Sequence, residues 1–182
     1  SDAETGGSIS VTSGRSTLTS SGAITISTFN AGKLGISGSL TFSTGTSSFG
    51  NSGQVEVGSG DAGGGRGGNI TLTVGDGDSG EGGHVRINAG LTSAAETTGG
   101  GVAIVAGHGY GSSFGHGGSA NVTGGVGRSA SGGSLRLFSG QGESTSSGNL
   151  SLVSANAGPT GVSGFMMVRT GTSSFGNSGW VT

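Results

Sequence analysis

The sequence predicts an all-β fold: a single-chain parallel β-solenoid of about eleven coils, each of roughly 15–18 residues. Three observations predict it. A glycine preceded by Gly or Ser returns at this spacing, a short apolar–polar alternation follows nearly every such glycine, and each unit is too short to bury its own apolar face. These recurring glycines are Gly7, Gly22, Gly38, Gly53, Gly68, Gly83, Gly100, Gly118, Gly133, Gly148, Gly164 and Gly179.

The residues after each recurring glycine are expected to form one strand. In residues 67–75, Ile70, Leu72 and Val74 alternate with Asn and Thr, which is typical of a half-buried strand. The third inward position is usually small, and a glycine that can turn the chain usually follows it. Inward pairs of the other units are Ile9/Val11, Ile24/Ile26, Leu40/Phe42, Val55/Val57, Val85/Ile87, Val102/Ile104, Ala120/Val122, Leu135/Leu137, Leu150/Leu152 and Met166/Val168.

The rest of each unit consists mostly of Gly, Ser, Ala and Asp, as in residues 75–81. We expect this stretch to return the chain to the start of the next strand, so that one unit makes one coil. Successive strands would then be parallel and ~4.8 Å apart, and eleven coils would form a rod of about 50 Å.

A longer repeat is superimposed on the short one. Residues 1–56 match residues 127–182 at an offset of 126 without a gap, and the ten residues TGTSSFGNSG at 44–53 recur at 170–179. The sequence therefore predicts one continuous solenoid over residues 1–182 that is a segment of a longer repetitive chain. A solenoid without caps exposes strand edges, and these favour end-to-end association.

The composition narrows the class of function. Glycine accounts for 46 of 182 residues, charged residues make up 9%, and the formal net charge is -2. No basic face is available for nucleic acid, and no apolar run approaches the roughly 18 residues of a membrane span. The absence of cysteine excludes disulfides and thiolate metal sites but indicates no compartment.

The sequence contains no arrangement typical of an enzyme or of a cofactor site. No serine lies in a nucleophile elbow or has a plausible His and Asp partner. Asp61 and Asp76 occupy the same position of adjacent units, with Asp78 nearby, so the sequence offers one weak candidate calcium site there. Other units lack Asp at this position, which argues against a fold built on calcium.

Three asparagines, Asn69, Asn121 and Asn149, stand in N-glycosylation sequons at outward strand positions. In a chain this rich in Ser and Thr, about two sequons are expected by chance, so the motif carries weight only if a eukaryotic cell secretes the protein.

Outward apolar residues are concentrated in the last four units. Such a cluster on an otherwise polar surface predicts a lateral contact with another chain. Its members are Phe138, Val153, Phe165, Met167 and Trp180.

The unit, as in SGSLTFSTG at 37–45, GGNITLTVG at 67–75 and SGNLSLVSA at 147–155, resembles long Ser/Gly/Thr repeats in secreted or surface proteins of algae, diatoms and related protists. It is similar also to arrays in phage and giant-virus fibre proteins. The resemblance implies an extracellular filament, stalk or surface fibre and no catalytic residues. Two alternatives stay open: an ice-binding or adhesive module, and a viral tail or fibre shaft, which predicts trimers.

Overall fold

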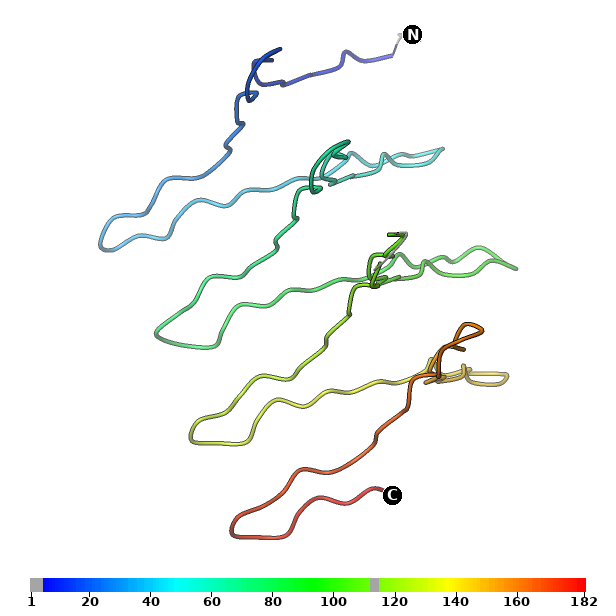
Figure 1. Ribbon diagram of the computed structural model, residues 1–182. Helices are drawn as coiled ribbons and strands as arrows, with labels where there is room; N and C mark the ends of the chain where they lie inside the picture. The colour runs from blue at the N-terminus through cyan, green and yellow to red at the C-terminus, as the bar shows by residue number, and fades with distance from the viewer. Residues whose placement is uncertain (1–4, 112–114) are drawn as a thin grey trace. The chain divides into compact units, whose positions relative to one another are not determined.

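The computed structural model describes residues 5–111 and 115–182, and within them the chain forms neither a helix nor a β-strand. The chain divides into two units, residues 1–86 and 87–182, and each is considered by itself. Both consist of extended segments joined by turns (Figure 1). We define a segment as the stretch from a recurring glycine to the third inward residue six positions later, for example 22–28 and 38–44.

A hydrogen bond closes the base of seven of the eleven turns between consecutive segments. In five turns the recurring glycine donates its backbone N–H to the carbonyl of the residue just after the preceding segment. The pairs are Gly22–Gly14, Gly100–Gly90, Gly118–Gly107, Gly133–Gly125 and Gly148–Gly140, at 2.9–3.0 Å. In two further turns a threonine hydroxyl at the third inward position closes the turn instead: Thr28 Oγ1 donates to Gly38 O at 3.1 Å and Thr44 Oγ1 to Gly53 O at 3.2 Å.

The recurring glycines all face the same way at these turns. A Cβ placed on each of the eleven glycines from Gly22 to Gly179 would meet the third inward residue of the preceding segment or the residue beside it. At Gly53 it would lie 3.4 Å from Thr44 Cγ2, and at Gly133 3.0 Å from the Gly125 nitrogen. Since the Cβ direction is the side-chain direction, the inward positions of two consecutive segments face each other across the turn. Each pair of segments is therefore an arch whose inner surface is made of side chains.

The arches show why the expected solenoid is wrong. The sequence predicts that the Gly- and Ser-rich stretch returns the chain so that each strand pairs with the next. The stretch instead forms a turn, whose ends are hydrogen-bonded to each other in seven of eleven cases. One unit is thus one side of a coil rather than a whole coil, and consecutive segments meet side chain to side chain. Among the described residues, seven backbone–backbone hydrogen bonds form and the longest-range of them joins Gly118 to Gly107, so no ladder connects successive segments.

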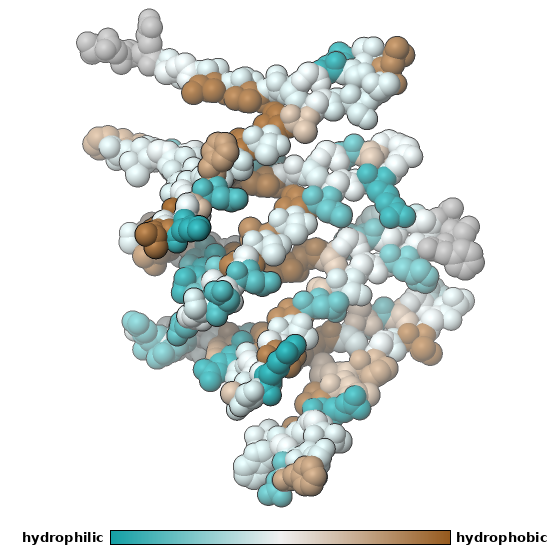
Figure 2. Space-filling model, turned by 90° about the vertical axis from the view of Figure 1, so that its left-hand side faces the viewer, coloured by the Kyte–Doolittle hydropathy of each residue, from teal (hydrophilic) through white to brown (hydrophobic). Residues whose placement is uncertain are grey.

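Nor does the chain have a core: no residue of the described ranges is buried. In Figure 2 apolar atoms lie open along the chain, uncovered by other parts of it. The accessible surface is 18621 Å². By the usual scaling with mass, a compact protein of 17.1 kDa exposes about 7,800 Å² and its extended chain about 25,000 Å². The single chain therefore hides only about a quarter of its extended surface.

Local structure nevertheless repeats with the sequence at the offset of 126. Gly35 donates to Gly32 O at 3.2 Å, and Gly161 donates to Gly158 O at the same distance. A Cβ on Gly50 would lie 3.4 Å from Ser47 Oγ, and one on Gly176 would lie 3.4 Å from Ser173 Oγ. These local contacts thus recur with the repeat, whereas among the described residues the hydrogen bond from Thr44 to Gly53 has no counterpart between Thr170 and Gly179.

Candidate functional site

The inner faces of the arches form the most regular chemical feature of the molecule. At the first two inward positions of each segment from residue 22 to 168, the Ile, Leu, Val, Phe and Met side chains are 52–79% exposed. Apolar residues in the turns are 89–104% exposed, among them Phe29, Phe49 and Val126. Exposure does not by itself distinguish inward from outward positions, because inward Ile104 is 79% exposed and outward Val105 is 78% exposed. The inward side chains are, however, less exposed than the apolar residues of the turns. More than half of each still faces solvent.

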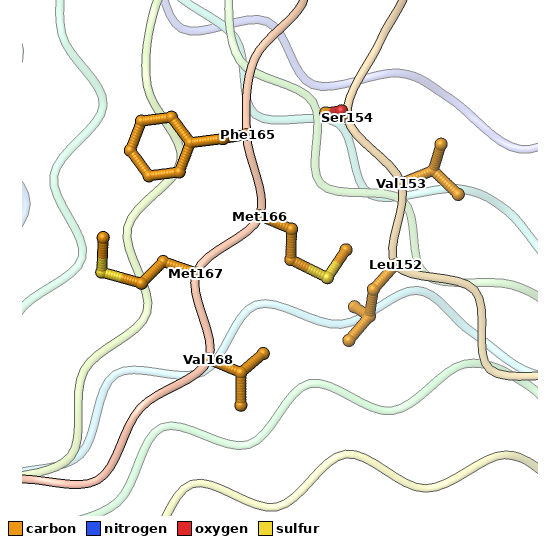
Figure 3. A pocket seen from close by; sticks show the side chains of 7 residues that line it. All are labelled: Leu152, Val153, Ser154, Phe165, Met166, Met167 and Val168. Carbon is orange, nitrogen blue, oxygen red and sulfur yellow. The ribbon is translucent and has the colours of Figure 1, made fainter.

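In one arch an open hollow of about 380 Å³ lies between residues 152–154 and 165–168. Figure 3 shows Leu152 directed toward Met166 and Val168, whereas Phe165 and Met167 point to the opposite side of their segment. The alternation expected from the sequence is therefore present side chain by side chain. The hollow is apolar, and Ser154 is the only polar residue among those that line it.

The outward apolar residues of the last units are well exposed in the second unit. Phe138, Val153, Phe165, Met167 and Trp180 have exposed fractions of 85%, 82%, 82%, 60% and 87%. Their lateral contact stays a prediction.

The unpaired backbone of the extended segments is a second candidate binding feature, and the sequence patterns did not indicate it. The extended segments carry one donor and one acceptor per residue, and the seven backbone bonds of the described residues all lie in or at the base of turns. An extended segment with free N–H and C=O groups on both edges is a template for pairing with another chain. The sequence contained one clue to these turns. Each segment usually ends at a small residue and the next segment begins at a glycine, and small residues at both ends allow a turn to close tightly.

Other candidate groups are not assembled. Within residues 5–111 and 115–182 no three His, Cys, Asp or Glu side chains come together as metal ligands, so the chain by itself does not gather Asp61, Asp76 and Asp78. His108 and Tyr110 stack loosely, with ring centroids 5.7 Å apart. The sequon asparagines Asn69, Asn121 and Asn149 are exposed.

None of the described residues belongs to a helix that is long and apolar enough to cross a membrane. Comparison with protein-family models, curated proteins and solved structures finds no match for this chain. The features that bear on function are therefore the arches, their exposed inner face and the unpaired backbone edges of their segments.

Proposed function

We propose that this chain is a structural subunit of an extracellular filament, stalk or surface fibre, and that it assembles with copies of itself. One observation carries the proposal: the chain exposes about 11,000 Å² more surface than a compact protein of its mass. Obligate interfaces between subunits bury about 2,000–5,000 Å², so the excess is large enough for an extensive assembly.

The regular spacing of the exposed apolar residues favours a chain that assembles, rather than a spacer that stays disordered. A flexible Gly/Ser linker has no need of apolar residues, yet here Ile, Leu, Val and Phe return at two inward positions in nearly every unit. Burying them is favourable only when a partner covers the inner faces, because the single chain leaves them 52–79% exposed. A repetitive partner that matches every unit is another copy of this chain.

The outward residues support a hydrated exterior. Ser, Thr and Asn occupy most outward positions, and charged residues account for only 9% of the chain. The exposed Asn69, Asn121 and Asn149 would be accessible to a eukaryotic glycosylation machinery. Such a surface suits an extracellular setting.

An ice-binding or adhesive face has less support. It needs a flat, regular row of small groups. Each segment has three outward positions, and Glu56, Arg86 and Met167 interrupt the row formed by the second of them, the middle outward row. It also needs a rigid scaffold, which a single chain without a core does not supply.

Sedimentation velocity and circular dichroism over a wide concentration range test the proposal. We expect a monomer with a coil spectrum at high dilution, and a larger species with a β spectrum as the concentration rises. A monomer with an unchanged coil spectrum at every concentration would contradict self-assembly. Thermal hysteresis of the same samples tests the ice-binding alternative.

A further inference from the structure

The arches determine the direction in which a partner must pair. In an extended segment, side chains stand perpendicular to the plane in which backbone hydrogen bonds form. Since the inward side chains of consecutive segments face each other, their N–H and C=O groups point above and below the arch. Partners therefore have to lie along the axis of the coil, over and under each segment, and not beside the arch.

The path of the chain gives the number of sides. In the first unit, the turns at 28–38 and 74–83 lie on the same side (Figure 1). The two turns that come between them along the chain, at 44–53 and 59–68, lie on other sides. In the second unit the same holds for the turns at 124–133 and 170–179, with those at 139–148 and 154–164 between them. One pass of the coil thus takes three segments in either unit.

We propose that the protein is a parallel homotrimer in which three chains interleave, so that segments of two further copies occupy the space between successive passes of each chain. This inference rests on the self-assembly proposed above and specifies its form; a trimer is also the state that the fibre-shaft alternative predicts. Closed oligomers have rotational symmetry, and a three-sided coil coincides with itself only after a rotation of 120°. A twofold axis would place a side of one chain against a corner of the other.

The threefold rotation also determines which residues become neighbours. On each side of the coil, segment n of the first chain lies next to segment n+1 of the second chain. That segment in turn lies next to segment n+2 of the third chain. Ile24 and Ile26 would thus lie beside Leu40 and Phe42 of the adjacent copy. Apolar inner positions meet apolar inner positions throughout, because all units share one register.

Charge favours this offset over stacking of identical segments. Identical stacking would place Glu56 on Glu56, Arg86 on Arg86 and Arg136 on Arg136, and like charges directly opposite each other are destabilising. With an offset of one unit, Glu56 lies between Thr41 and Thr71 of the other chains instead. No two charged residues of the middle outward row then become neighbours.

The outward apolar cluster fits the same offset. Phe138 and Val153 occupy the last outward position of consecutive units, and Phe165 and Trp180 the first outward position of consecutive units. The offset makes each pair neighbours on adjacent chains, where apolar and aromatic pairs stabilise a sheet. Residues that are 82–87% exposed in the single chain would thereby cover one another.

Cysteine cross-linking tests the arrangement, and the chain has no cysteine of its own. Thr25 and Thr41 are exposed residues at the middle outward position of consecutive segments. Paired strands lie ~4.8 Å apart, within the Cα separation that a disulfide requires. After mild oxidation, the double variant Thr25→Cys/Thr41→Cys should therefore give covalent trimers, with three times the mass of the 17.1 kDa chain, on a non-reducing gel.

Two control variants separate the arrangements. Thr25→Cys alone should give no covalent oligomer in the trimer, because its three copies lie on different sides, whereas identical stacking would give covalent dimers. Thr25→Cys/Thr71→Cys joins segments three units apart, and an internal disulfide would mean that one chain closes on itself. Either of those two results overturns the interleaved trimer.

Sedimentation equilibrium of the unmodified chain completes the test, and the expected mass is three times that of the 17.1 kDa chain. A monomer at all concentrations would overturn both the self-assembly and the trimer. A different oligomer, or end-to-end polymers that are not built from trimeric subunits, would overturn the trimer and leave the structural function standing.

Discussion

Replacing Leu72 with serine should weaken assembly strongly, because Leu72 is an inward residue whose side chain is 76% exposed in the single chain. Complete burial of a leucine side chain contributes about 1.5–3 kcal/mol. The part still exposed is therefore worth about 1.1–2.3 kcal/mol per chain, or about 3–7 kcal/mol when three chains bury it together.

This free energy can be read as a shift in concentration. Since 1.4 kcal/mol corresponds to a factor of ten, the dissociation constant of the trimer should rise by about 10²- to 10⁵-fold. The midpoint concentration of a monomer–trimer equilibrium varies as the square root of this constant. The midpoint of the Leu72→Ser variant should therefore rise by roughly 20- to 300-fold.

The matched control is Thr71→Ser, one residue away on the outward side of the same segment. This change removes one methyl group from a surface that faces solvent in the assembly, so the midpoint should move less than about threefold. Both variants are compared by sedimentation velocity over a dilution series, with the β signal in circular dichroism as a second readout. Equal midpoints for Leu72→Ser and Thr71→Ser would refute the burial of the inner face.

Three further predictions concern the turns, the outward patch and salt. A Cβ on Gly124 would lie too close to the Gly133 carbonyl, whereas a Cβ on Gly125 meets nothing within 4 Å. In thermal unfolding, Gly124→Ala should therefore destabilise the assembly by about 1–3 kcal/mol per chain, and Gly125→Ala by much less. In the same sedimentation assay, the double variant Phe165→Ser/Trp180→Ser should assemble more weakly than the unmodified chain. The control Phe175→Ser removes a fully exposed turn residue and should leave assembly unchanged. Equal assembly of the two variants would show that the outward apolar residues make no contact between chains. Raising NaCl from 0.05 to 0.5 M should change the midpoint little, since only 9% of residues are charged; a strong salt dependence would point to ionic contacts instead.

The short repeat decided the local structure, and much of it was predictable from the residues. The alternation is visible at residues 165–168, where Met166 and Val168 point to the side opposite Phe165 and Met167 (Figure 3). Equal turns at Gly35 and Gly161 follow from the 126-residue repeat. Both features depend on interactions over about ten residues, which the sequence specifies directly.

The pairing of segments was not predictable in this way, and the single-chain solenoid expected for it was wrong. Alternation shows which side chains of a segment lie together, but it contains no information about which backbone pairs with which. The hydrogen bond from Gly22 to Gly14 decides that the Gly- and Ser-rich stretch is a closed turn, so that consecutive segments face each other through their side chains. The hydrogen bond itself is local, but the face that one segment presents to the next depends on the path of the backbone through the turn. The apolar–polar pattern does not encode that path, so only the three-dimensional structure supplied it.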